Sequence, residues 1–199
     1  MKRLLVLSAL IAAIQLTALS ARAETGGGSD WSIENLMQIR QQIKSATARF
    51  TERRTLQILR EPLETSGVLS YVAPDQVQKE TLQPKPERLT VDRDTLTIDE
   101  GPDGEKRTLS LEEYPEIWAF VESIRATLAG DLPALTRFYS VRFTGSAADW
   151  QLLLLPEQRK MQDLVKWIRI AGSQGSIRTI ETEERNGDHS EMTVTQDRQ

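Results

Sequence analysis

The 199-residue sequence has no cysteine and only one histidine, and each shortage excludes a class of chemistry. Without cysteine the chain forms no disulfide and cannot carry the lipid-modified cysteine of a bacterial lipoprotein, so its packed core alone must hold the fold. The single histidine, His189, has no partners at the spacing that a metal site or a catalytic triad requires. We interpret it as a solvated residue beside a hairpin turn.

Catalytic motifs are equally scarce. The sequence contains neither a phosphate-binding glycine loop nor a Gly-x-Ser-x-Gly nucleophile elbow. Two pairs of neighbouring carboxylates, Asp92 with Asp94 and Glu112 with Glu113, stand at a turn and at the start of a helix, where acids favour solvent and caps. We therefore expect a protein that is not an enzyme and that needs no metal and no cofactor.

Basic charge is also in short supply, because 25 Lys and Arg residues face 29 Asp and Glu residues and give a net charge of −4. That balance argues against nucleic acid, or an anionic membrane surface, as the main partner. The chain is long enough for one domain that buries its own core.

Long apolar runs are confined to the first residues. Lys2-Arg3 precede an apolar run from Leu4 to Leu19, and Ala21-Arg22-Ala23 has the small-x-small pattern of a cleavage site. An uncleaved N-terminal anchor is the alternative, but the run is short for a membrane span and no second run follows it. We expect a signal peptide over residues 1–23 cleaved after Ala23, export to the periplasm, a flexible lead-in over residues 24–30 and one domain over residues 31–199.

Alternation of apolar and polar residues predicts a fold that is mostly β. In the clearest strand, residues 63–73, the side chains of Leu69, Tyr71 and Ala73 share one face. Turn signals at 101–104 and at Asn186-Gly187 indicate hairpins between short strands, and therefore an antiparallel meander of about ten or eleven strands. The other predicted strands are 47–59, 76–83, 87–91, 95–99, 106–109, 141–144, 150–155, 164–170, 176–184 and 189–195.

Helical spacing marks three helices. Ser29 or Asp30 is expected to cap the first helix, which runs to about Ser45. The second covers residues 115–129 and ends at a glycine, and the third covers residues 131–139. Residues 157–163 fit either a turn of helix or a loop. Because the second and third helices interrupt a meander, they must lie across an end or a face of the sheet.

Aromatic residues make up only 6% of the chain and gather in this helical insert and in the strands after it. A curled sheet of many strands can enclose a cavity for one apolar ligand, with the two helices as its lid. An ordinary solid core uses the same residue types at the same spacing, so periodicity leaves both interpretations open.

Several short motifs stand in a characteristic order along the chain. Residues 48–52 read Ala-Arg-Phe-Thr-Glu, and residues 92–96 read Asp-Arg-Asp-Thr-Leu. The others are 66–74, 81–84, 153–156, 175–177 and 186–187. As an ordered set these motifs resemble those of the LolA family of periplasmic carriers of outer-membrane lipoproteins. In that family a Phe-x-Gln segment corresponds to residues 48–52, and an Asp-Gly-x-x-Leu turn corresponds to residues 92–96. The resemblance covers most of the chain after the signal peptide.

The resemblance implies an α+β, mostly β fold, in which an incomplete antiparallel barrel is closed by short helices over a hydrophobic cavity. It implies a carrier that shields acyl chains between the inner and outer membranes, with an inner-membrane exporter and an outer-membrane acceptor as partners; we expect a monomer. The candidate cavity and lid residues are Phe50, Leu69, Tyr71, Ala73, Val77, Ile117, Phe120, Val121, Ile124, Phe138, Phe143, Trp150 and Leu152.

The chain also departs from the family pattern. Lipoprotein carriers of this family have an arginine just before the strand-ending proline, and it hydrogen-bonds the helical lid, whereas this chain has Ala73 there. Val77 and Lys79 replace large apolar residues farther along. We hypothesise that Arg125 or Lys79 replaces the latch, and that the cargo is a non-protein lipid such as a glycolipid or an aryl polyene lipid.

Two alternatives remain. A lipid-sensing or scaffold protein in envelope-stress signalling would use the same fold, although such regulators usually carry a second domain or a tether, and we expect none here. A solid-core β domain that binds protein partners would need no cavity.

Overall fold

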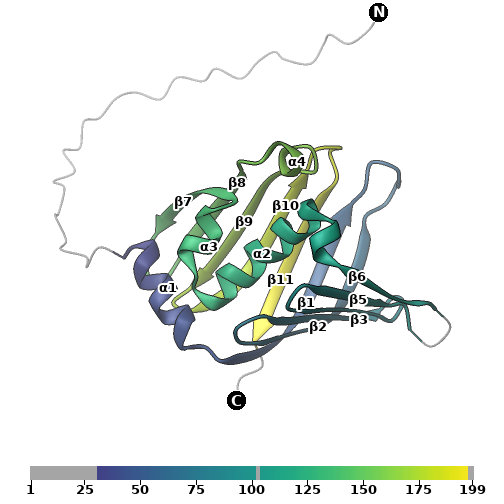
Figure 1. Cartoon of the computed structure of the whole chain (residues 1–199), viewed down its shortest axis with the longest axis horizontal. Coiled ribbons are helices and arrows are strands. Elements are labelled where there is room, and N and C mark those ends of the chain that lie inside the picture. The colour runs from purple at the N-terminus through teal and green to yellow at the C-terminus, as the bar shows by residue number, and fades with distance from the viewer. Residues whose placement is uncertain (1–30, 102–103, 197–199) are drawn as a thin grey trace, which may run out of the picture.

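The computed structural model describes residues 31–101 and 104–196 (Figure 1). The predicted signal peptide and lead-in lie outside the described residues, as do Pro102 and Asp103 of the predicted turn and the last three residues of the chain.

In the described residues, eleven strands form one antiparallel sheet in the order β6-β5-β4-β3-β2-β1-β11-β10-β9-β8-β7. The chain folds into two runs of hairpins, and the sheet becomes continuous where β1 pairs with β11. The edge strands β6 and β7 stay apart, so the curled sheet is open, as the predicted incomplete barrel requires. The strands are β1 (Ser45–Thr55), β2 (Leu63–Val72), β3 (Gln76–Gln83), β4 (Glu87–Asp92), β5 (Thr95–Asp99), β6 (Lys106–Ser110), β7 (Tyr139–Gly145), β8 (Trp150–Pro156), β9 (Val165–Ser173), β10 (Ser176–Glu184) and β11 (His189–Gln196).

Short helices cover one face of this sheet, which we call the inner face; α1, α2 and α3 lie in front of the strands in Figure 1. Asp131 caps α3 by accepting a hydrogen bond from the Ala134 backbone N–H at 3.0 Å. Gly130 ends α2 in the left-handed conformation, with φ of 71°. The helical elements are α1 (Ile33–Gln42), the 3₁₀ turn η1 (Leu111–Glu113), α2 (Pro115–Ala129), α3 (Leu132–Thr136) and α4 (Arg159–Gln162).

Two of the predicted helices have different ends. Ser32, rather than Ser29 or Asp30, caps α1, because its hydroxyl and the side chain of Asn35 bond each other's backbone N–H groups. This helix ends at Gln42, since β1 begins only three residues later. The third helix is shorter than predicted, and Tyr139 already belongs to β7.

The first strand is also shorter than predicted. It ends at Thr55, and the backbone N–H of Gln57 bonds the Asp188 side chain at 2.7 Å instead of continuing the ladder. Ile58, which the alternation placed on the same face as Phe50, is therefore 88% exposed in the loop that follows.

The apolar core is divided between two unequal clusters on the inner face. The larger one lies between α1, α3 and strands β7–β10, which we call the packed half of the sheet; it includes Leu152, Leu154 and Ile170. The smaller one contains the buried residues Val91, Leu111 and Val121, beside strands β2–β6, which we call the open half. The α2 helix contributes side chains to both clusters.

Candidate functional site

The pairing register brings the predicted strand residues to one face of the sheet. Phe50 of β1 pairs with Gly67 of β2, and Tyr71 of β2 pairs with Val77 of β3. Paired residues project to the same side, so these side chains form a continuous stripe. The stripe faces α2 and continues on β7 and β8. Its predicted members are Phe50, Leu69, Tyr71, Val77, Phe143, Trp150 and Leu152.

In the packed half, Phe138, Trp150 and Leu152 fill the core, and Phe143 on the edge strand is half-buried against it. Trp150 and Leu152 are at most 1% exposed, and Phe138 packs against the ring of Trp118 edge to face, with centroids 5.2 Å apart. The indole N–H of Trp150 donates to the Gln174 carbonyl at 2.8 Å. A Cβ on Gly172 would come within 2.5 Å of the Trp150 ring, so the backbone itself seals this wall.

In the open half, the same face is only partly covered. Leu69 and Val77 are half-buried, and so are Leu96 and Ile98 farther along the sheet. From α2, Ile117 and Val121 reach the cluster around Val77 and Val91, while Phe120 packs against the core of the packed half and Ile124 is half-buried. The inner face of the open half is therefore less completely covered than that of the packed half.

An arginine on α1 holds the C-terminal end of α2. Arg40 is only 3% exposed, and its guanidinium donates three hydrogen bonds to backbone carbonyls: two to Leu128, at 3.2 and 3.0 Å, and one to Gly175, at 2.8 Å. Leu128 lies in the last turn of α2, where carbonyl groups carry partial negative charge. Burial lowers the pKa of Arg40 from its usual value.

Close backbone contact reinforces this junction. Gln41 donates to the Gly130 carbonyl at 2.9 Å. A Cβ at residue 130 would lie 2.3 Å from the Met37 carbonyl oxygen, so only glycine lets α1 and the end of α2 approach this closely. The end of α2 is therefore fixed to α1.

A second arginine, Arg125, ties α2 to the strands of the open half. Its Nη1 donates to the Arg93 carbonyl at 3.1 Å, and its Nη2 lies 3.7 Å from Asp75 Oδ2. These two contacts reach the β4–β5 turn and the β2–β3 turn. Of the two residues expected to replace the missing latch, Arg125 joins the helix to the strands, whereas Lys79 pairs within the sheet.

Ala73 and Tyr71 lie beneath this contact. Ala73 stands just beyond the end of β2, half-buried, with its N–H bonded to the Lys44 carbonyl at 2.9 Å. Tyr71 is 3% exposed, and burial raises the pKa of its hydroxyl although Arg40 and Arg125 oppose the shift.

A charged pair interrupts the apolar stripe. Glu52 of β1 is 8% exposed and forms a short salt bridge with Lys79 of β3. Its other carboxylate oxygen accepts a hydrogen bond from the Ser190 hydroxyl at 2.6 Å. Burial acts to raise the pKa of Glu52, but Lys79 and these hydrogen bonds outweigh it and the pKa is lowered. The Lys79 ammonium also lies 5.0 Å from the centre of the Phe50 ring.

Two grooves of the described surface are lined mainly by residues outside this stripe, although Glu52 also borders the first. One, of about 520 Å³, lies along β11, β1, β2 and β3, and the other, of about 440 Å³, lies where β3, β4 and β5 meet. Most of their lining residues are charged or hydroxyl-bearing, such as Arg53 and Glu64 in the first. Their chemistry is not that of an acyl-chain site.

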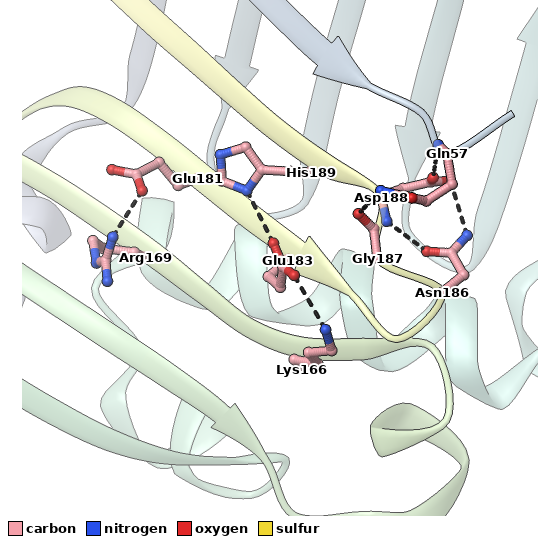
Figure 2. Close-up of polar contacts among 9 residues, drawn as sticks. All are labelled: Gln57, Lys166, Arg169, Glu181, Glu183, Asn186, Gly187, Asp188 and His189. Atoms are coloured by element: carbon pink, nitrogen blue, oxygen red, sulfur yellow. Dashed lines mark hydrogen bonds and ion pairs between the residues drawn. The ribbon is translucent and has the colours of Figure 1, made fainter. Parts of the chain in front are cut away.

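The outer face of β9–β11 carries ion pairs (Figure 2). His189 lies here, half-buried, with its Nδ1 3.2 Å from Glu183 and its ring 6.1 Å from that of Trp167. It is therefore more enclosed than the solvated position that the sequence predicted. The described residues contain no group of three or more His, Cys, Asp or Glu side chains placed to hold a metal ion. None of the described helices is long and apolar enough to cross a membrane.

Arg40 is not among the functional residues that the sequence predicted. Its signal was its position, because it follows Ile33, Leu36 and Met37 at helical spacing on the apolar face of α1. A charged residue on the buried side of an amphipathic helix needs a partner there. In this fold the partners are the Leu128 carbonyl in the last turn of α2 and the Gly175 carbonyl in the β9–β10 turn.

The sequence of this chain matches a known protein family. The family described as outer membrane lipoprotein carrier protein LolA-like matches residues 26–196. The chain belongs to the LolA-like family. The match spans all of the described strands and helices, so the open sheet and the helix across it are features of a LolA-like chain. No curated protein sequence matches this one.

Solved structures give more distant matches. A LolA superfamily protein from Nitrosomonas europaea is 11% identical, with a TM-score of 0.46 over 84% of this chain and 92% of its own. The Pseudomonas aeruginosa MucA/MucB complex gives 13% identity and a TM-score of 0.42 over 82% of this chain and 54% of the other. An outer membrane lipoprotein-sorting protein domain from Vibrio parahaemolyticus is 11% identical, with a TM-score of 0.40 over 81% of this chain and 88% of its own. With such low scores, the family assignment rests on the sequence match.

Proposed function

We propose that this LolA-like protein is a periplasmic carrier that shields acyl chains between α2 and the inner face of the open half. The observation that carries the proposal is the uneven burial of one continuous apolar stripe. Trp150 and Leu152 are sealed at one end of it, whereas Leu69 and Val77 are only half-covered at the other. The protein acts by binding and release rather than by catalysis.

The energetics suit such a role. Burial of a methylene group is worth about 0.8 kcal/mol, so a sixteen-carbon chain gains about 12 kcal/mol on leaving water. A carrier must offer apolar surface on that scale and still release the chain. Apolar residues beneath a helix that can move provide both, because the helix covers them when the site is empty.

The contacts of α2 support it as the moving part. Its C-terminal end is fixed by Arg40, whereas over the open half Arg125 supplies polar contacts with the strands and Ile117 and Val121 supply apolar ones. Beneath it, the buried Tyr71 hydroxyl and Arg125 Nε have no hydrogen-bond partner among the described residues. Buried donors without acceptors bear a desolvation cost, which a movement of α2 that admits water would relieve. We propose that α2 swings about its fixed C-terminal end.

The cargo we propose is a lipid other than a lipoprotein, such as a glycolipid or an aryl polyene lipid. Support comes from the position of Ala73, where lipoprotein carriers keep an arginine, and from the Glu52–Lys79 pair within the apolar stripe. A charged pair among apolar residues suits a ligand that has polar groups near its hydrocarbon.

Native mass spectrometry of protein purified from the periplasm of its own host tests the proposal. We expect a co-purifying lipid, whose mass would give the cargo class, and the delipidated protein should take up a fluorescent fatty acid. Protein that leaves the periplasm empty and takes up no fatty acid would contradict a carrier and equally a lipid sensor. Lipid that stays bound in the presence of acceptor membranes would favour the sensor.

A pair of neighbouring substitutions tests the site. Leu69 faces inward and Ser70 faces outward on β2, and both are half-buried. Leu69→Asp should reduce fatty-acid uptake at least about tenfold, because it puts a charge on the proposed contact surface, whereas Ser70→Asp should leave uptake nearly unchanged. Equal losses in the two variants would show that the inner face of the open half is not the binding surface.

A further inference from the structure

The loop between β1 and β2 displays aliphatic side chains to solvent. Ile58 is 88% exposed and Leu59 is 49% exposed, and Leu63 at the start of β2 is 36% exposed. Single exposed apolar residues are ordinary on protein surfaces, but here they follow one another on one projecting loop. We call residues 56–63 the β1–β2 tip.

The tip is held in place by a neighbouring hairpin (Figure 2). The Gln57 backbone N–H donates to Asp188 Oδ1 at 2.7 Å, and its side chain donates to the Gly187 carbonyl at 2.9 Å. Asn186 and Asp188 bond each other at 2.8 and 2.9 Å and stiffen the same turn. Because Gln57 is anchored from both its backbone and its side chain, the next two residues project in a fixed direction.

A third segment adds to the same end of the molecule. Leu164, between α4 and β9, is 47% exposed, and its carbonyl accepts a hydrogen bond from the backbone N–H of Arg185 at 2.8 Å. Arg185 precedes the turn that anchors Gln57. In Figure 1, α4, the β10–β11 turn and the β1–β2 tip lie at one end of the sheet. The exposed aliphatic residues of two loops therefore gather around one hairpin turn.

Arginines are frequent in the segment that includes the tip, although Glu64, Glu184 and Asp188 contact the same segment. Residues 53–63 contain Arg53, Arg54 and Arg60 but only one acidic residue, Glu61, in a chain whose net charge is −4. Arg53 lies 3.5 Å from Glu64, and Arg54 lies 3.6 Å from Glu184; surface pairs of this kind are weak and leave the arginines able to meet other anions.

We propose that the β1–β2 tip is a membrane-contact surface, which seats Ile58 and Leu59 in the interface of an anionic bilayer. Aliphatic side chains flanked by arginines suit this interface, because the apolar groups enter the acyl boundary while guanidinium groups meet lipid phosphates. The overall acidity argues against membrane binding by the whole surface, but it does not exclude a local contact through apolar residues flanked by arginines. Few residues insert, so the contact is weak and reversible.

Flotation with vesicles tests this proposal on the full mature chain, without any cargo. Phosphatidylcholine vesicles with and without phosphatidylglycerol separate the apolar and electrostatic contributions. We expect binding that is stronger on the anionic vesicles and weaker at high salt. Leu59→Asp should raise the apparent Kd about tenfold, and Arg60→Glu should weaken binding to the anionic vesicles only.

The matched control is Val72→Asp, because Val72 is 48% exposed and lies at the opposite end of β2 from the tip. It should bind vesicles like the wild type. Equal losses of vesicle binding in Leu59→Asp and Val72→Asp would overturn the proposal. So would a wild-type protein that binds no vesicles, and that result would leave a protein as the partner of the tip. Fatty-acid uptake in solution should be unchanged in Leu59→Asp, so this test and that of the carrier function fail separately.

Discussion

The two halves of the sheet have the same strand geometry but bury very different amounts of their inner faces. Leu152 and Leu154 on β8 are fully buried, whereas Leu69 on β2 is half-buried although it faces the same way. The packed half therefore supplies stability, and the open half keeps apolar surface that the protein does not fully cover. Under the proposed carrier function, that division separates the part that stays rigid from the part that accepts a ligand.

Strand composition explains the difference. On β8 the inward positions are Trp150, Leu152 and Leu154, all large and apolar. On β3 they are Val77, Lys79 and a threonine, which cannot fill the same volume. Helices α1 and α3 cover the packed half as well, while the described cover of the open half consists of α2 and the short turn η1.

The largest expected effect comes from removing the same side chain in each half. Leu152→Ala leaves a cavity in a sealed core and should lower the free energy of unfolding by about 3–4 kcal/mol. Leu69→Ala should lower it by only about 1 kcal/mol, because solvent already reaches that side chain. Urea unfolding of both variants, followed by tryptophan fluorescence, measures the difference.

Fatty-acid uptake should also differ between these two variants. Leu69→Ala should weaken fatty-acid uptake, while Leu152→Ala should leave it intact below the unfolding transition. If the two variants lose the same stability, the open half is packed like the other half, and the distinction between them is wrong.

The Arg40 junction gives the next largest effect. Arg40→Met keeps the length of the side chain but leaves the buried carbonyls of Leu128 and Gly175 without their donors. We expect a loss of about 2–3 kcal/mol in the free energy of unfolding, since unsatisfied buried groups bear a desolvation penalty. Thermal and urea unfolding would measure it.

The neighbouring Gln41→Met is the control. It removes one hydrogen bond, to the Gly130 carbonyl, from a side chain on the exposed side of α1, and should lower stability by less than about 1 kcal/mol. A similar loss in both variants would mean that Arg40 is an ordinary surface contact rather than the fixed end of α2.

Much of this fold was predictable because period-2 alternation and turn residues are local signals. The strands at 76–83, 95–99 and 176–184 and the helix at 115–129 have the bounds that the sequence predicted. The alternation also placed Leu69 and Tyr71 on the inner face correctly, since pairing register preserves parity along a strand.

The rest depended on contacts between distant segments. The exposure of Ile58 follows from the bonds between Gln57 and the β10–β11 turn, about 130 residues away, and no local pattern encodes them. The two carbonyls that accept from Arg40, those of Leu128 and Gly175, are likewise remote in sequence. Whether an apolar residue is sealed or half-covered depends on which helix lies above it, so periodicity could not divide the stripe into its two halves.

The smallest effect on stability, and the most direct test of the lid, is expected at Arg125. Arg125→Ala removes the contacts with Arg93 and Asp75 but leaves the Arg40 junction intact, so it should lower the free energy of unfolding by only about 0.5–1 kcal/mol. Because these contacts hold α2 over the open half, the rate of fatty-acid uptake in stopped-flow experiments should rise. Glu122→Gln is the control, since it weakens only the pair within α2 at 3.4 Å. An uptake rate that stays the same in Arg125→Ala would show that α2 does not gate the apolar stripe, and that the open half exchanges its ligand past a fixed helix.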